Sequence, residues 1–329
     1  MRVGVVGVGA VGRVALAALV ADPGVSSVVA VSGRSRPTDL HRDVEVRDDP
    51  GAGPPDDADV VIVTDPRQVR RVAAEALLQG AHVVATADDP VAVRSLLSLH
   101  SEARERNLTV AIGAGLAPGL GCVLARWAGA RLDAVDEVHV ASTGTGGPAC
   151  ARAHHASLSS MAVDYHEGAW RRRPGGSGRE LVWFPEPVGG ADCYRCDRAD
   201  PLLLVPAFPG VRRVTARVAA TRRDRTTAWL PMMRRPHPEG LVGAVRAEVR
   251  GWRQGRAHTE VVGVSARPAL AAGTVGAIAA SWAGRARLAR AGAGGLGELI
   301  DEPAAFLRAL GAAGISTSVF EGSSAASQP

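Results

Sequence analysis

Residues 2–19 read RVGVVGVGAVGRVALAAL, and this stretch decides the fold. An apolar run is broken by Gly7, Gly9 and Gly12 and then continues with apolar residues at helical spacing. A strand, a glycine turn and a helix in this order bind a nucleotide diphosphate, because bare backbone N–H groups and the positive end of a helix favour negative charge. The alternative is a glycine turn with a structural role alone. We predict that the cofactor contacts Gly7, Gly9, Ala10, Val11 and Gly12.

The end of the second apolar run, residues 28–31, indicates which cofactor is bound. NAD enzymes place Asp or Glu there, about 20 residues after the glycines, to bind the ribose hydroxyls. This chain has Ser32-Gly33-Arg34-Ser35-Arg36 instead. No carboxylate repels a 2′-phosphate there, and two guanidiniums can bind one, so the segment favours NADP(H) over NAD(H). The alternative is that Arg34 and Arg36 are solvated loop charges.

The composition limits the class of protein. A chain of 329 residues with 46% hydrophobic and 22% charged residues can bury the cores of two domains. Its apolar runs are shorter than a membrane span, and no signal peptide opens the chain, so we expect a cytoplasmic protein. The four cysteines are too few for a disulfide framework. Cys193-x-x-Cys196 has no second pair, so we predict no metal site and free thiols.

The basic residues are all arginine: the sequence has 38 of them and no lysine. A lysine general base, a Schiff-base lysine and a Walker lysine are therefore excluded. The formal net charge is +5, but the arginines are scattered and only 4% of residues are aromatic. This pattern does not suit nucleic-acid binding, and we expect no nucleic-acid partner.

Short apolar runs alternate with helical patterns through the first third of the chain. Residues 58–64, 81–86 and 108–112 read as buried strands, and residues 44–46 as a weak strand. Helices are expected at residues 68–78 and after Asp89, the latter with Val91, Val93, Leu96, Leu97 and Leu99 facing inward. This alternation predicts a doubly wound parallel sheet, which binds ligands beyond the carboxyl ends of its strands. We therefore add to the cofactor site Thr64, Asp65, Pro66, Thr86, Ala87, Gly115 and Pro118.

Residues 149–168 supply the candidates for proton transfer. A helix over this stretch would place His154, Leu158, Met161 and Tyr165 on one face, with His155 on the adjacent face. Histidine titrates near neutral pH and suits general acid–base chemistry. We predict His154, His155 and Tyr165 as catalytic candidates, and the alternative is a histidine with no part in the chemistry.

Glycine and proline motifs further along the chain resemble a known family. Gly113-Ala114-Gly115-Leu116-Ala117-Pro118-Gly119, which leaves a strand and enters a helix, resembles a loop of the saccharopine dehydrogenase (saccharopine reductase) family. Gly168-Ala169-Trp170, Phe184-Pro185-Glu186-Pro187-Val188-Gly189 and residues 295–310 extend the resemblance over most of the chain. It implies a Rossmann doubly wound parallel sheet followed by an α+β domain with a mixed sheet. The second sheet, between residues 135 and 264, would pair two subunits as a homodimer.

The expected domains follow from this resemblance. Residues 1–120 would form the NADP-binding Rossmann domain, and residues 121–270 the α+β domain for substrate binding and dimerisation. Residues 271–320 would form a helical segment that returns to the Rossmann domain. Residues 321–329 (EGSSAASQP) are small and polar, and we expect a disordered tail.

The resemblance also implies a reaction: NADP-dependent reduction of an imine or carbonyl in a small amino or oxo acid, or the reverse oxidation. Such substrates carry carboxylates, which arginine binds in a bidentate manner. Arg152, Arg195 and Arg217 are the arginine candidates, with Gly146 of the glycine-rich loop beside the substrate. The alternatives are an amino-acid dehydrogenase of the aspartate, diaminopimelate or homoserine type, and a non-catalytic NADP-binding regulator.

Overall fold

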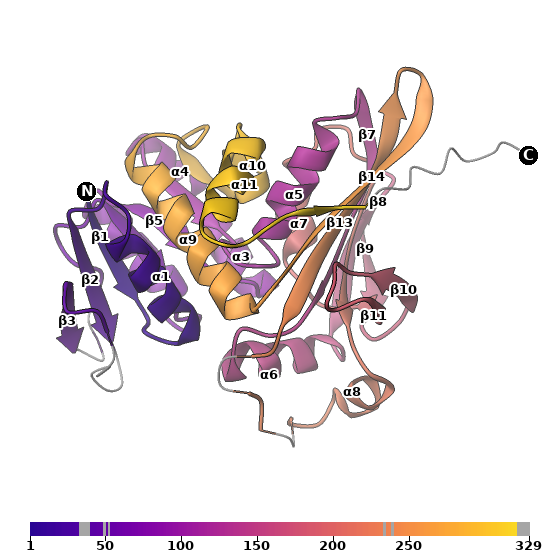
Figure 1. Ribbon diagram of the computed structural model, residues 1–329, viewed down its shortest axis with the longest axis horizontal. Coiled ribbons are helices and arrows are strands. Elements are labelled where there is room, and N and C mark those ends of the chain that lie inside the picture. Colours follow the sequence, from indigo (N-terminus) through magenta and orange to yellow (C-terminus); the bar gives the residue numbers. More distant parts are fainter. Residues whose placement is uncertain (33–39, 49–50, 52, 233–234, 238–239, 321–329) are drawn as a thin grey trace, which may run out of the picture.

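Two β-sheets stand side by side in the computed structural model, with helices between and around them (Figure 1). The structure describes residues 1–32, 40–48, 51, 53–232, 235–237 and 240–320. The predicted phosphate-binding residues Gly33, Arg34, Ser35 and Arg36 and the predicted disordered tail at 321–329 lie outside the described residues. No described helix has both the length and the apolar character needed to cross a membrane.

The first sheet is parallel throughout and has the order β15-β6-β5-β4-β1-β2-β3. Every residue of the central strand β4 is at most 1% exposed, because helices cover both faces of the sheet. The predicted doubly wound parallel sheet is confirmed. Its strands are β1 (Arg2–Val6), β2 (Ser27–Ser32), β3 (Val44–Asp48), β4 (Val60–Val63), β5 (His82–Ala85), β6 (Thr109–Ile112) and β15 (Gly292–Gly295).

The helices of the first half follow the predicted alternation with one correction. They are α1 (Ala10–Val20), α2 (Val69–Leu78), α3 (Pro90–Leu97) and α4 (His100–Glu105). The single helix expected after Asp89 is broken between α3 and α4, and Val91, which we expected to face inward, is 71% exposed. Val93 and Leu96 of α3 are fully buried. A residue two positions before Val93 on a helix points away from the sheet, which explains the exposure of Val91.

The second sheet is mixed and has the order β10-β11-β12-β7-β13-β14-β16, with β8 paired to β12 and β9 paired to β8. Only β7 and β12 run parallel, and the pairs on either side of them are antiparallel. Its strands are β7 (Ala134–Thr143), β8 (Met161–His166), β9 (Ala169–Pro174), β10 (Glu180–Trp183), β11 (Gly190–Arg195), β12 (Arg213–Ala219), β13 (Gly243–Arg253), β14 (Arg256–Ala266) and β16 (Ser318–Val319).

The remaining helices join the two sheets. α5 (Leu120–Gly129) packs against β13 and β14 of the second sheet and contacts α10 and α11 on its other side. α9 (Pro268–Gly284) packs against α1, β4 and β5, so the chain returns to the first sheet after β14. The domain boundaries stay predictions. The other helices are α6 (Pro148–Ser157), α7 (Asp200–Leu204), α8 (Arg222–Thr227), α10 (Leu296–Leu299) and α11 (Pro303–Ala312).

The predicted helix over residues 149–168 is wrong in its second half. α6 ends at Ser157, and residues 161–166 form β8, which pairs with β9 and β12. Ala162 and Asp164 are buried while their neighbours are more exposed, an alternation with the period of a strand. Tyr165 therefore shares no helix face with His154, and its ring packs edge-on against Trp170 at 5.1 Å. Strand pairing with distant residues outweighed the local helical spacing.

Asp22 ties α9 to the loop between α1 and β2. Its carboxylate accepts hydrogen bonds from Ser281 (2.7 Å) and Arg285 (2.5 Å) of the α9 end, and from the Gly24 N–H (2.9 Å). Burial opposes the charged form, but these donors outweigh burial and lower the pKa of Asp22. The contact thus stabilises the fold only while Asp22 is ionised.

We expect Asp22→Asn to lower the free energy of unfolding by on the order of 1 kcal/mol at neutral pH, because charged hydrogen bonds are lost at a partly exposed site. The lowered pKa makes the contribution complete above the unfolded-state pKa of 3.8 and removes it as the pH falls through the folded-state pKa. Urea unfolding of both proteins across a pH series measures this difference. Asp43→Asn, at an exposed position, is the control, and an equal loss in both variants would contradict the prediction.

Candidate functional site

A cavity of about 950 Å³ lies between the two halves of the molecule, at the carboxyl ends of the parallel strands. The glycine turn after β1 and the ends of β4 and β5 line one side, and the loop from β7 into α6 lines the other. Many of the predicted site residues line it: Gly7, Gly9, Ala10, Val11, Ser32, Thr64, Asp65, Pro66, Thr86, Ala87, Gly115, Pro118, Gly146 and His154.

The glycine turn brings α1 close to the end of β1. Gly7 has a φ of +102°, and its carbonyl accepts a hydrogen bond from the Thr64 hydroxyl (2.7 Å). A Cβ atom at Gly12 would lie 2.0 Å from the carbonyl oxygen of Gly7, whereas a Cβ atom at Gly9 would meet nothing within 4 Å. Gly12 therefore serves the packing of α1, and Gly9 leaves space in the cavity. No side chain caps the first turn of α1. This arrangement fits a diphosphate.

The charges described at this end of the cavity suit an anion. Ser32 ends β2 where an NAD enzyme would carry an acid. Arg13 and Arg67 also line the cavity, and Arg67 pairs with Asp65 (3.3 Å). Burial raises the pKa of Asp65, but hydrogen bonds from Arg67 and Gln68 outweigh it and the net shift is downward. Asp65 therefore stays ionised, and its charge is offset by Arg67.

The opposite wall of the cavity begins with a glycine loop. Gly144, Gly146 and Gly147 precede α6, whose N-cap Gly147 has no side-chain cap and whose first residue is Pro148. Cys150 and His154, one helical turn apart on α6, both line the cavity. All four cysteines are free, and Cys150 is the one that is not fully buried. Burial raises the pKa of its thiol to about 11, so it is protonated at neutral pH.

Arg198 connects the two walls. Its Nη1 donates a hydrogen bond to Asp88 (3.1 Å) and contacts Nε2 of His154, and its Nη2 donates to the carbonyl of Ala117. Burial and the neighbouring Arg198 charge hold the pKa of His154 well below its usual value. His154 is therefore neutral at pH 7, with Nε2 facing a guanidinium that can only donate. This geometry disfavours proton donation from Nε2, although the catalytic role of His154 stays a prediction.

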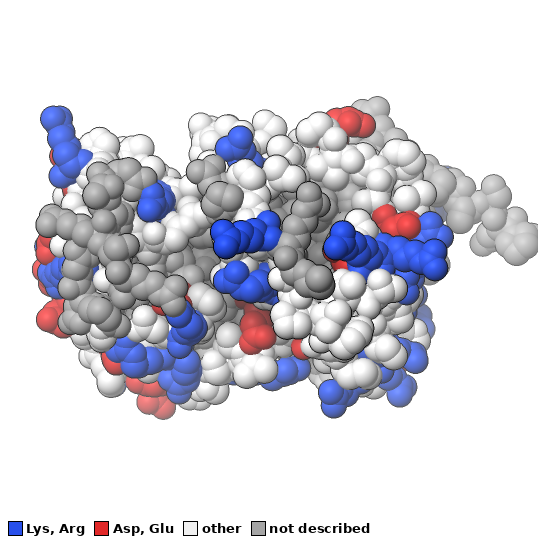
Figure 2. All heavy atoms as spheres, turned by 90° about the horizontal axis from the view of Figure 1, so that it is seen from below, with Lys and Arg blue, Asp and Glu red and all other residues white. Residues whose placement is uncertain are grey.

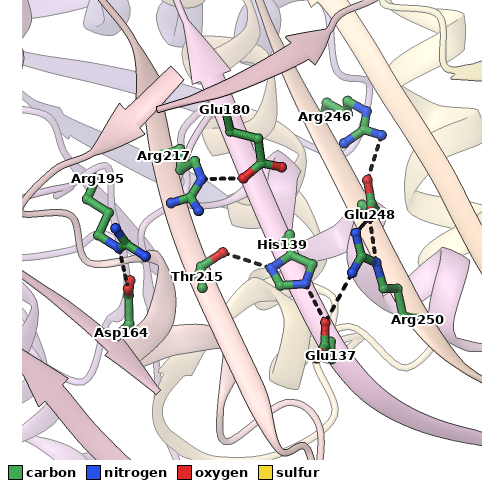
Figure 3. Close-up of polar contacts among 10 residues, drawn as sticks. All are labelled: Glu137, His139, Asp164, Glu180, Arg195, Thr215, Arg217, Arg246, Glu248 and Arg250. Atoms are coloured by element: carbon green, nitrogen blue, oxygen red, sulfur yellow. Dashed lines mark hydrogen bonds and ion pairs between the residues drawn. The ribbon is translucent and has the colours of Figure 1, made fainter. Parts of the chain in front are cut away.

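The other predicted catalytic and substrate residues do not line the cavity. His155 is buried, and its Nε2 contacts the carbonyl of Thr227 (3.0 Å). Tyr165 lies on β8, and Arg152 is exposed on α6. Arg195 pairs with Asp164 (3.0 Å) and Arg217 with Glu180 (2.6 Å) on the second sheet (Figure 3). None of these side chains reaches the cavity.

Sequence reasoning missed Cys150 and Arg198. Cys150 precedes His154 by one helical turn, so the sequence did contain a pattern that points to it. Asp88 follows β5 as Asp65 follows β4, at the strand ends where the sequence predicts the ligand. Arg198 lies 110 residues from Asp88 and among many other arginines. No spacing pointed to it. The Cys193 and Cys196 thiols are buried on β11 and directly after it, and neither lines this cavity.

Neither a scan against models of protein families nor a search of curated proteins finds a match. Among solved structures, the chain is similar to saccharopine dehydrogenase (L-Glu forming) from Saccharomyces cerevisiae, with a TM-score of 0.67 and 15% identity over 97% of this chain and 99% of that chain. An amine dehydrogenase from Mycobacterium smegmatis has a TM-score of 0.52 and 12% identity, over 91% and 95% of the two chains.

A third similar structure is an engineered D-amino acid dehydrogenase bound to NADP+, with a TM-score of 0.51 and 15% identity over 92% of this chain and 95% of that chain. At these identities the likeness shows the fold. The chain has the saccharopine dehydrogenase-like fold, a Rossmann parallel sheet followed by a mixed sheet, as the sequence motifs led us to expect.

We expect Gly12→Ala to lower the free energy of unfolding by about 2 kcal/mol, because the added methyl group meets a backbone oxygen that cannot move without α1. Gly9→Ala is the matched control: Gly9 has a φ of −81° and open space around it, so the change should alter stability by only a few tenths of a kcal/mol. Urea unfolding of the two variants measures the difference, and similar stabilities would disprove the packing role of Gly12.

Proposed function

We propose that this chain is an NADP-dependent oxidoreductase that reduces an imine or carbonyl of a small amino or oxo acid, or catalyses the reverse oxidation. The observation that carries the proposal is the cavity that joins the glycine turn, the strand ends and the α6 wall. A dinucleotide that enters at the glycine turn would extend along the strand ends toward Cys150, His154 and Arg198. The cofactor would supply the hydride, and the protein would position the substrate.

Several observations support NADP(H) over NAD(H). Ser32 puts no carboxylate at the end of β2, and the sequence places Arg34 and Arg36 directly after it. Arg13 and Arg67 line the same cavity. Figure 2 shows basic side chains near the middle of the face seen from below, between the two halves of the molecule. The similar D-amino acid dehydrogenase was solved with NADP+ bound.

The α6 wall supports a substrate that carries a carboxylate. The first turn of α6 has no side-chain cap, and Gly146 and Gly147 expose backbone beside the cavity. Arg198 lies on the same side, but its positive charge is paired with Asp88 at 3.1 Å. In place of Arg152, Arg195 and Arg217, we therefore infer that the substrate carboxylate lies at the start of α6.

Titration of the purified protein with NADPH and NADH, followed by quenching of tryptophan emission, tests the cofactor. We expect tighter binding of NADPH. Arg34→Asp should weaken NADPH by about tenfold or more and spare NADH, because it removes a cation and adds an anion at the 2′-phosphate. Gly9→Ala should weaken both cofactors equally, because its methyl group fills space that the diphosphate needs.

Failure to bind either cofactor would overturn the proposal, and equal losses for both cofactors in Arg34→Asp would remove Arg34 as the phosphate ligand. Oxidation of NADPH in the presence of 2-oxo acids and amines then tests the reaction. Binding without turnover, with a partner protein that co-purifies, would instead support the non-catalytic regulator.

We also propose that two copies pair through the second sheet, in the cytoplasm. β10 is an edge strand of that sheet, and two of its residues on one face, Leu181 and Trp183, are 59% and 62% exposed. An exposed apolar edge strand is a liability unless another chain covers it. The opposite face of the sheet, to which Glu180 points, carries paired charges of both signs, such as Arg217 with Glu180 (Figure 3).

We expect light scattering after size exclusion to show a dimer for the native chain and a monomer for the double variant Leu181→Ser, Trp183→Ser, because the apolar contact area is lost. Trp229→Ser is the control, since Trp229 is 73% exposed in the turn after α8 and should leave the dimer intact. A native monomer, or a dimer that persists in the double variant, would refute pairing through β10.

A further inference from the structure

We propose that Arg198 is a positioning residue that holds Asp88 and His154 on opposite walls of the cavity and fixes the His154 ring as a neutral hydrogen-bond acceptor at Nε2. Its guanidinium thereby brings Asp88 and His154 Nε2 together, as a bound cation between them would. This role of Arg198 goes beyond the proposed function and requires neither cofactor nor substrate.

The contacts of Arg198 span the whole cleft. Asp88 follows β5 of the first sheet, Ala117 belongs to the loop between β6 and α5, and His154 lies on α6. One guanidinium contacts all three, and its side chain is only 5% exposed. Because the donors of a guanidinium are coplanar, these contacts set the separation of the walls and also the orientation of the imidazole.

The alternative is a metal ion bound between Asp88, Cys150 and His154 in place of the Arg198 guanidinium. Single ligand atoms of Asp88, Cys150 and His154 all lie within 4.8 Å of one another, and the three residue types suit Zn²⁺. However, Nη1 of Arg198 contacts Nε2 of His154 and lies 3.1 Å from Oδ2 of Asp88. Those two acceptor atoms are 4.0 Å apart, and the Arg198 guanidinium contacts both of them. A second cation there would be repelled at short range.

Asp200 supports the position of the guanidinium from the other side. Its side chain is 2% exposed, and Oδ2 lies 3.5 Å from Nε of Arg198. Burial raises the pKa of Asp200, and the neighbouring Arg198 charge opposes this rise. The contact therefore keeps the Arg198 guanidinium and the Asp200 carboxyl group together in the protein interior.

The charged and titratable groups that face His154 are Arg198, Asp88 and Cys150. Since Arg198 cannot accept a hydrogen bond, Nε2 must be the acceptor, and the single proton of the neutral ring must sit on Nδ1. Burial and the Arg198 charge both keep the pKa of His154 low. Loss of the Arg198 charge should therefore raise it, and loss of the Asp88 charge should not.

Nitrogen-15 NMR of the native full-length protein tests the proposal first. The His154 ring, assigned by its disappearance in His154→Gln, should show a protonated Nδ1 and an unprotonated Nε2 at pH 7. A proton on Nε2, or a charged ring at that pH, would overturn the proposal. This measurement does not depend on the folding of any Arg198 variant. His155, whose Nε2 contacts the Thr227 carbonyl instead, provides an internal control for the tautomer.

The second measurement is the pH titration of the same resonance in variants. Arg198→Met should raise the pKa of His154 by about one unit or more, because a charge in contact is removed. Arg198→Lys should retain most of the lowering, since the neighbouring Asp88 carboxylate favours the charged form of the ammonium. An unchanged His154 pKa in folded Arg198→Met would reduce Arg198 to a packing role and contradict the proposal.

Titration of the native protein with Co²⁺ tests whether Asp88, Cys150 and His154 bind a metal ion. We expect no cobalt–thiolate absorption and no protection of Cys150 from alkylation. A stoichiometric cobalt–thiolate band that is lost in Cys150→Ser would show that a divalent ion displaces Arg198, and would overturn the proposal. None of these readouts uses NADPH, so they are independent of whether the oxidoreductase function holds.

Discussion

The close approach of α1 to the end of β1 is the contact on which the rest of the structure depends. Gly12 lies so near the carbonyl of Gly7 that no side chain fits between them, and the Thr64 hydroxyl bonds to the same carbonyl. The turn, the helix start and the end of β4 are thereby fixed as one unit. The positive end of α1 opens onto the cavity only because this packing aims it there.

The same principle of small residues at close contacts fixes α9 against α1. A Cβ atom at Gly273 would lie 2.5 Å from the Cβ atom of Val14. The backbone of α9 at Gly273 therefore packs directly against the Val14 side chain of α1. Nearly every side chain of α9 is buried, although its residues are small. α9 directly follows β14 of the mixed sheet. The packing of α9 against α1 therefore also determines how the second sheet is positioned relative to the cavity.

The sequence was sufficient for the parallel sheet because each strand is a short, continuous apolar run that local composition alone reveals, as β4 shows. It was not sufficient for residues 161–166, where helical spacing suggested a helix and pairing with β9 and β12 produced a strand. Within the site, the glycine turn could be predicted from spacing. Arg198 could not, because its partners Asp88, Ala117 and His154 come together only through the packing of the two sheets.

The absence of lysine gives the cavity its particular electrostatics. A buried lysine loses its charge readily, since desolvation lowers its pKa into the physiological range. A guanidinium keeps its charge when buried and offers donors in several directions at once. Arg198 uses both properties, because it stays charged beside Asp88 and Asp200 and still reaches Ala117 and His154. Arg198 therefore keeps, beside Asp88, a positive charge that pH does not remove, while Cys150 and His154 next to it stay neutral at pH 7.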